Sequence, residues 1–262
     1  MSLAFSLGNL LMHIRPAPLA VLFKRLLFVR RQVVPTIDGT FWVDPASDAG
    51  QRVYDSGRYE PETVAVLQQV LRPGDTYVDI GANEGYFCVT AARKVGPAGR
   101  VVAIEPQARL AAVLRRNFDL NGIRVEHVAA AISAQSGTAT LHLTPDVNTG
   151  ASGLASSTRY RLATQTVSTL TLAELFAQLK LAGPLVMKMD IESWEHDAIL
   201  GSPEIFQRGL VRVLVLELHP SVLRQRGLDP EAVPQFLRSC GYEHLAGSGG
   251  LAWVHSQART SN

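Results

Sequence analysis

The sequence has few cysteines and no Cys/His cluster of the kind that binds zinc. Its 262 residues include two cysteines, Cys88 and Cys240, which are far apart and lie outside any Cys-x-x-Cys or Cys/His motif. This pattern indicates neither a disulfide framework nor a structural zinc site. A chain of this length can bury one sizeable core without such cross-links. We therefore expect a protein of the cytoplasm, which is a reducing compartment.

Long hydrophobic runs are also missing. The apolar segment 1–11 is interrupted by polar residues and is followed by His13, Arg15 and two prolines. It is therefore too short to form a transmembrane helix. No internal repeat and no long linker divides the chain.

Acidic residues are absent before Asp38, although the whole chain has a net charge of only +2. The same stretch contains five basic residues, namely Arg15, Lys24, Arg25, Arg30 and Arg31. Residues 19–31 are predicted to form an amphipathic helix with a basic side. This helix either packs on the rest of the protein, where it could cover the cleft, or binds a membrane surface or a partner. The small net charge and the lack of a basic stripe elsewhere argue against nucleic acid as a partner.

The chain beyond this helix is predicted to open with a β-hairpin. Two β-rich runs, residues 33–37 and 40–43, flank Asp38-Gly39, the dipeptide favoured in type I′ turns. A loop follows, and Pro61 then marks the start of a helix over residues 60–71. We expect an N-terminal extension over residues 1–58 and one catalytic domain over residues 59–262.

From residue 76 onward, strands and helices alternate, which is typical of a parallel sheet. The predicted strands cover residues 76–80, 100–104, 125–132, 138–143, 185–189, 210–218 and 251–255, and the predicted helices cover residues 85–95, 108–120, 171–181 and 230–240. The pattern predicts an α/β fold with a doubly wound, mostly parallel, Rossmann-like sheet. The polar segment 145–160 is either a substrate loop or a plain surface loop.

The strongest local signal is the turn after the first of these strands. It contains Asp79, Gly81, Asn83 and Gly85, and its glycines let a ligand lie against the backbone at the carboxyl edge of the sheet. Glu105 ends the second strand about twenty residues later, where an acid accepts hydrogen bonds from ribose hydroxyls.

This turn differs from a dinucleotide site. Asn83 occupies the second glycine position of the G-x-G-x-x-G motif, and Asp79 and Glu84 place negative charge where phosphates would bind. Carboxylates here suit S-adenosylmethionine, which carries a sulfonium and an amino group but no phosphate. NAD binding and a purely structural turn are the alternatives.

At this point the chain resembles the FkbM family of S-adenosylmethionine-dependent methyltransferases. The matching pieces, in family order, are Tyr59-Glu60-Pro61-Glu62, the turn from Val78 to Tyr86, Ile104-Glu105-Pro106, Asn117 with Asn121, Lys188-Met189-Asp190-Ile191-Glu192 with Glu195, and Leu216-Glu217-Leu218-His219. The resemblance implies a class I methyltransferase fold and methyl transfer, mostly to hydroxyl oxygens of sugars, lipids or natural products. One departure is Ser193, which stands where the family usually has glycine and is followed by Trp194.

Most of the predicted cofactor contacts lie in this motif region. Asp79, Gly81, Asn83 and Gly85 are expected to line the methionine end of the cofactor. The remaining candidates are Glu105 for the ribose, Glu60 for the amino group, and Ala131, with Ala130, for the adenine. Glu105 could instead cap the next helix, and Glu60 could act only on the helix dipole.

The acceptor side is expected at the carboxyl ends of the predicted strands 185–189 and 210–218. The predicted catalytic residues are Lys188, Asp190, Glu192 and His219, with Glu195 and Glu217 beside them. His219 or Asp190 is the candidate base, although His219 could be a structural histidine bonded to Glu217. Asp190 and Glu192 could hold Mg²⁺. Because Lys188 could neutralise the same charge, we expect no metal.

These observations predict an enzyme that methylates a hydroxyl of a small-molecule acceptor such as a glycan, a lipid-linked sugar or a natural product. One alternative is N-methylation of an amine or protein, for which the cluster of Asp190, Glu192 and Glu195 could provide an acidic pocket. Another is a non-catalytic cofactor-binding protein, suggested by Ser193 in the acceptor motif.

Overall fold

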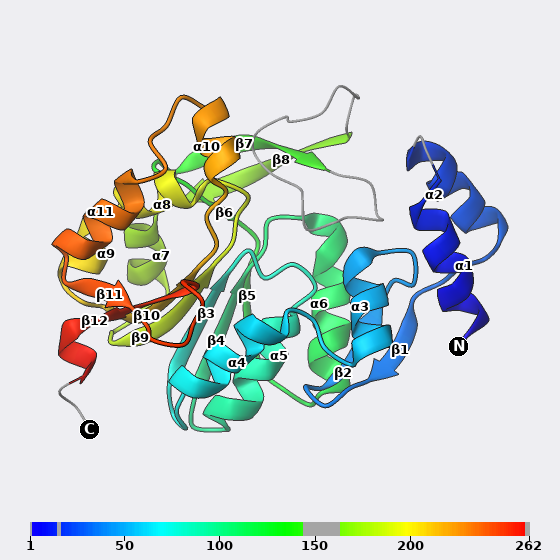
Figure 1. The fold of residues 1–262 in the computed structure, drawn as a ribbon, viewed down its shortest axis with the longest axis horizontal. Helices are drawn as coiled ribbons and strands as arrows, with labels where there is room; N and C mark the ends of the chain where they lie inside the picture. Colours follow the sequence, from blue (N-terminus) through cyan, green and yellow to red (C-terminus); the bar gives the residue numbers. More distant parts are fainter. Residues whose placement is uncertain (1, 15–16, 144–162, 260–262) are drawn as a thin grey trace.

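The computed structural model describes residues 2–14, 17–143 and 163–259 (Figure 1). Helices cover both faces of a central sheet, as expected for a doubly wound α/β fold. The predicted segment 145–160 lies outside the described residues.

The central sheet has seven strands. From edge to edge they are β11 (Tyr242–His244), β12 (Ala252–His255), β10 (Val211–Leu216), β9 (Leu185–Met189), β3 (Thr76–Ile80), β4 (Arg100–Ile104) and β5 (Glu126–Val128). The five strands from β10 to β5 are parallel, whereas β12 and β11 are antiparallel additions. Strand β9 is buried along its whole length, which explains its nearly unbroken apolar sequence. The mostly parallel sheet predicted from the sequence is confirmed.

Two hydrophobic clusters pack on opposite faces of this sheet. One face is covered by α4 (Pro61–Val70), α5 (Tyr86–Val95) and α6 (Ala108–Leu120), and the other by α7 (Leu172–Gln178), α8 (Glu195–Leu200), α9 (Pro203–Gln207) and α11 (Ala232–Ser239). Local signals fix several helix starts: Pro61 begins α4, and Thr171 forms a capping box with Glu174 at α7. The short helix α10 (Pro220–Gln225) follows β10, and a 3₁₀ helix covers Ser256–Arg259.

The predicted strand over residues 125–132 is wrong as a single element. It divides into β5, in the central sheet, and β6 (Ala131–Ile132), in a separate three-stranded sheet. That sheet has the order β6-β8-β7 and contains β7 (Gly137–Leu143) and β8 (Ala163–Leu170). Residues 129–130 separate β5 from β6. The chain changes sheets there because β6 pairs with β8, which is distant in sequence.

The N-terminal part contains α1 (Leu3–Met12), α2 (Ala17–Leu26), the hairpin of β1 (Gln32–Pro35) and β2 (Thr40–Val43), and α3 (Asp48–Ser56). The hairpin is confirmed, but its predicted type I′ turn is wrong. A type I′ turn requires a positive φ at Asp38, and Asp38 does not have one. Instead, the Thr36 hydroxyl accepts hydrogen bonds from the Asp38 and Gly39 amides, and the buried Asp38 carboxylate accepts one from Tyr86.

The N-terminal part shares the core of the rest of the molecule. Phe5, Phe41 and Val53 belong to the same hydrophobic cluster as α4 and α5. Among the described residues, no helix combines the length and the hydrophobicity that a membrane span requires.

Candidate functional site

A cavity of about 310 Å³ lies at the carboxyl ends of β3, β4, β9 and β10. This is the edge at which doubly wound sheets bind their ligands. Nine of the eleven predicted site residues line it, namely Glu60, Gly81, Asn83, Glu105, Ala131, Lys188, Asp190, Glu192 and His219. The structure therefore brings most of the predicted cofactor and acceptor residues to one cavity. Asp79 and Gly85 are not among the lining residues.

Gly81 begins the turn after β3 and has a φ of 84°. A Cβ at this position would come within 2.0 Å of the carbonyl oxygen of Asp190, at the end of the neighbouring strand β9. Glycine is therefore required for the two strand ends to meet. The amides of Gly81 and Ala82 both donate to the carbonyl oxygen of Ile104, which fixes the turn against β4.

Gly85 has a packing role instead of a place on the cavity wall. Its φ is 82°, and a Cβ there would lie 2.7 Å from the ring of Phe118 and 2.8 Å from the side chain of Leu114, both on α6. The missing side chain thus lets α5 start close to α6. The sequence indicated the need for glycine here, but not the reason for it.

Asp79 is fully buried beneath the turn. Its Oδ2 accepts a hydrogen bond from the Cys88 thiol at 3.3 Å, and its Oδ1 has no hydrogen-bond partner. Burial raises the pKa of Asp79 to about 6, although the nearby Lys188 ammonium acts in the opposite direction. The sequence predicts this carboxylate on the cavity wall, but the structure places it one layer deeper, because its position in β3 points it toward Cys88 on α5.

Glu105 is buried at the end of β4 and lines the cavity. Its two carboxylate oxygens accept hydrogen bonds from the amides of Asn83 and Gln107, each at 2.9 Å. Gln107 is the residue just before α6, so Glu105 also performs the capping role considered as an alternative. Burial raises its pKa to about 7, while these two amides lower it. The carboxylate thus joins the turn after β3 to the start of α6.

The acceptor side of the cavity holds Lys188, Asp190, Glu192 and His219. The Lys188 ammonium lies 3.3 Å from Asp190 Oδ2 and 4.9 Å from the centre of the Phe87 ring. Burial alone would lower the pKa of Lys188, but the carboxylates of Asp190, Asp79 and Glu60 raise it above its ordinary value. Lys188 is therefore positively charged at neutral pH.

The Nε2 atom of His219 lies 3.8 Å from Glu217 Oε1. That separation is too long for the hydrogen bond considered for a structural histidine. Its Nδ1 is buried and has no hydrogen-bond partner. One ligand atom each from Asp190, Glu192 and His219 lies within 4.8 Å of the others, a spacing that could hold a cation. Asp190 also forms the ion pair with Lys188.

The loop after β9 carries the departure from the family motif. Glu192 and Ser193 have φ values of 56° and 74°, so serine adopts the left-handed conformation that a glycine would provide. The Arg226 guanidinium donates to the Ser193 carbonyl oxygen, pairs with Asp197 at 2.8 Å, and lies 4.1 Å from the centre of the Trp194 ring. Sequence reasoning missed Arg226 because it is 33 residues away from this loop.

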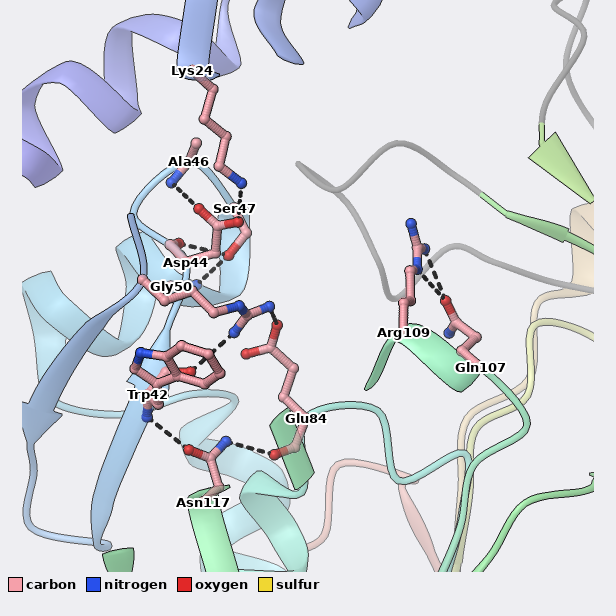
Figure 2. Close-up of polar contacts among 11 residues, drawn as sticks. Lys24, Trp42, Asp44, Ala46, Ser47, Gly50, Glu84, Gln107, Arg109 and Asn117 are labelled. Atoms are coloured by element: carbon pink, nitrogen blue, oxygen red, sulfur yellow. Dashed lines mark hydrogen bonds and ion pairs between the residues drawn. The ribbon is translucent and has the colours of Figure 1, made fainter. Parts of the chain in front are cut away.

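The N-terminal part supplies a wall of the cavity that sequence reasoning also missed. Phe41, Val43, Ala49 and Val53, from β2 and α3, line it. Figure 2 shows how this part is attached: the Asn117 side chain accepts from the Trp42 amide and donates to the Glu84 carbonyl oxygen. The Glu84 carboxylate in turn pairs with Arg31 at 2.5 Å. The family resemblance contained Asn117, and its role is now apparent.

The charges around the cavity are mainly negative. Among the described residues that line it, six carry carboxylates, namely Glu60, Glu84, Glu105, Asp190, Glu192 and Glu217, and one, Lys188, carries an ammonium group. Burial raises the pKa of Glu192 and of Glu217, and Asp190 adds to both shifts. Such a site favours a ligand with positive charge over one with phosphates.

This fold and this cavity define a class I methyltransferase. The family model for the methyltransferase FkbM domain matches residues 79–244. The chain therefore belongs to the FkbM family of S-adenosylmethionine-dependent methyltransferases.

Individual relatives are more distant. Protein-L-isoaspartate O-methyltransferase from Aeropyrum pernix is 38% identical over 66 residues, which are 24% of this chain and 25% of that protein. The chain thus matches only about a quarter of that relative's length. Among solved structures, Aeropyrum pernix fibrillarin, in complex with S-adenosyl-L-methionine, is 13% identical over 73% of this chain and 72% of its own, with a TM-score of 0.40. The putative rRNA-methylase from Clostridium thermocellum is 13% identical over 74% and 91% of the two chains, with a TM-score of 0.44.

Proposed function

We propose that this methyltransferase transfers the methyl group to a hydroxyl oxygen of a small molecule. The observation that carries the proposal is the His219 imidazole on the wall of the cavity. It lies beside Asp190 and Glu192 in the same cavity as the Gly81 turn. A hydroxyl acceptor needs such a base, because its proton must leave as the new bond forms.

The residues of the turn fit S-adenosylmethionine. The excess of carboxylates around the cavity suits the cationic sulfonium and amino groups of this cofactor. Gly81 and Asn83 would lie at its methionine end, Glu105 would hold its ribose, Glu60 its amino group, and Ala131 its adenine. When bound, the cofactor supplies an electrophilic methyl group, and its C–S bond breaks as the acceptor O–C bond forms.

In this mechanism the protein acts by positioning and by proton transfer. The walls of the cavity hold the acceptor oxygen in line with the methyl group, which removes much of the entropic barrier. His219 receives the hydroxyl proton. Lys188 holds the Asp190 carboxylate through their ion pair, and Asp190 then orients the acceptor hydroxyl.

Nitrogen methylation is the second candidate, and the six carboxylates around the cavity favour it, since they would attract an amine. A non-catalytic role has less support, because Ser193 retains the positive φ that the family glycine provides. Cytoplasmic location stays part of the proposal, and it is supported by Cys88 and Cys240, which are both free thiols.

The test is incubation of the full chain with methyl-labelled S-adenosylmethionine and a panel of sugars, glycolipids, natural products and amines. Mass spectrometry and NMR of the products should place the label on oxygen. Label found only on nitrogen would overturn the proposal in favour of the second candidate. Cofactor binding by calorimetry without turnover on any acceptor would support the non-catalytic role.

A further inference from the structure

The exposed hydrophobic side chains of this protein are concentrated in one region. In the part of the chain that the structure describes, every large hydrophobic side chain that is exposed lies between Leu3 and Ile37. Four of them, Leu19, Leu22, Phe23 and Leu26, have the spacing of one helical face on α2. The following turn adds Phe28, which is 74% exposed.

We call these five side chains the α2 surface. Figure 1 shows α1 and α2 at the end of the molecule opposite β11. Large apolar patches are rare on monomeric proteins and indicate an interaction site. The α2 surface thus needs a partner.

The charges near the α2 surface indicate which partner it fits. Arg25 and Arg30 are exposed beside it, and the sequence has no carboxylate before Asp38. The other two basic residues of this stretch that the structure describes are held by the domain: Lys24 pairs with Asp44 and Arg31 with Glu84. The outward charge is therefore positive. Two copies of the chain meeting at this surface would bring their arginines together, which disfavours a dimer.

We propose that the α2 surface docks on a lipid bilayer that carries anionic headgroups. The leucines and phenylalanines enter the boundary between headgroups and acyl chains, and Arg25 and Arg30 bind the lipid phosphates. The proposal rests on α2 and the residues just after it, and it does not depend on the methyl acceptor. It therefore can fail while the proposed function holds, and the reverse is also true.

The test is co-sedimentation of the full chain with vesicles of phosphatidylcholine alone and of phosphatidylcholine mixed with phosphatidylserine. We expect binding to the mixed vesicles, and its loss when salt is raised from about 0.1 M to about 1 M, because the screening length falls from about 10 Å to about 3 Å. Absence of binding to the mixed vesicles, or equal binding to both kinds, would overturn the proposal.

Variants assign the binding to the α2 surface. Arg25→Glu with Arg30→Glu should weaken vesicle binding by at least tenfold, since each arginine near the surface contributes about fivefold. The matched control is Arg115→Glu with Arg116→Glu, two exposed arginines on α6, which should leave binding unchanged.

Apolar variants test the insertion of the side chains. Leu26→Ser with Phe28→Asn should weaken binding roughly tenfold or more. Phe28 has a φ of 51°, which asparagine tolerates, so this pair should fold normally. A concentration-dependent dimer in sedimentation velocity that disappears in this pair would show that a second copy covers the surface, and would refute the membrane proposal.

Discussion

Ser193 lies in a backbone conformation that favours glycine, and it is also fully buried with a hydroxyl that has no hydrogen-bond partner. Both features cost folding free energy. Ser193→Gly should therefore raise the free energy of unfolding by about 1 kcal/mol in urea denaturation. The control is Ser202→Gly. The buried Ser202 hydroxyl accepts a hydrogen bond from the Ala173 amide, so its loss should destabilise the protein. A loss of stability in both variants would contradict the argument.

Glu195 should make stability depend on pH. It is buried, its Oε1 accepts from the Ile191 amide, and its Oε2 has no partner. Burial raises its pKa from 4.5 to about 8, so the folded state holds a proton that the unfolded state releases above pH 4.5. Its contribution to the free energy of unfolding therefore falls as pH rises from about 4.5 to about 8.

Glu195→Gln removes this titration. Relative to the parent chain, the variant should gain on the order of 2 kcal/mol between pH 5 and pH 8 in urea denaturation at each pH. The exposed Glu62→Gln serves as the control and should show no such gain. If the free energy of unfolding of the two variants changes equally between pH 5 and pH 8, Glu195 is ionised in the folded protein at neutral pH.

His219 is the residue on which the chemistry of the proposed function depends. His219→Gln should lower the turnover of the acceptor about 10²- to 10⁴-fold, because proton removal is lost. Cofactor affinity, measured by calorimetry, should stay the same. The control is His196→Gln on α8, which lies outside the cavity lining. Turnover that persists at the parent level in His219→Gln would assign proton removal to Asp190 or to solvent.

At the scale of elements, α6 attaches the hairpin to the cofactor turn. Asn117 bonds the Trp42 amide on one side and the Glu84 carbonyl oxygen on the other, whereas Asn121 bonds only Thr40 and its own helix. Each asparagine replaced by alanine should cost about 1–3 kcal/mol of stability, because partly buried backbone groups, two for Asn117 and three for Asn121, lose their hydrogen-bond partners. Only Asn117→Ala should also weaken cofactor binding in calorimetry, since Glu84 belongs to the turn. An equal loss of affinity in both variants would refute this division of roles.

Elements with strong local signals were predicted closely. Strands β3, β4 and β9 and helix α6 were predicted with the bounds that the structure shows, because each combines an apolar period with Gly, Pro or Asn at its ends. Strand β8 was missed, since its sequence is largely polar and its pairing with β7 and β6 joins distant segments. Helix α3 was also missed, although it lines the cavity.

The site residues divide in the same way: some were predicted from local sequence, and others depend on contacts between distant segments. Parallel strands end at one edge, so Gly81, Glu105 and Asp190 were predicted to converge, and the structure brings them to one cavity. The inward burial of Asp79 and the bonds of Arg226 depend on contacts between distant segments, which spacing along the chain does not reveal.

At the scale of the whole molecule, residues 1–58 were predicted to form an N-terminal extension of the catalytic domain. Phe41 and Val53 belong to the main core and to the cavity wall, and the Phe41 ring stacks on Tyr86 with centroids 4.4 Å apart. The segment beginning at residue 59 would expose this core. We therefore expect that removing residues 1–58 abolishes both the cooperative thermal transition and cofactor binding.

A point variant tests the same claim without deleting chain. Phe41→Ala should destabilise the full chain by about 3–5 kcal/mol, as for a buried aromatic residue, and should weaken cofactor binding because it opens the cavity wall. Val33→Ala, in the same hairpin but 47% exposed, should leave cofactor binding unchanged. A chain from residue 59 that unfolds cooperatively and binds S-adenosylmethionine as tightly as the full chain would show that the N-terminal part is dispensable. The packing of Phe41 against Tyr86 predicts the opposite, because the residue that starts α5, directly after the cofactor turn, would then lose its stacking partner.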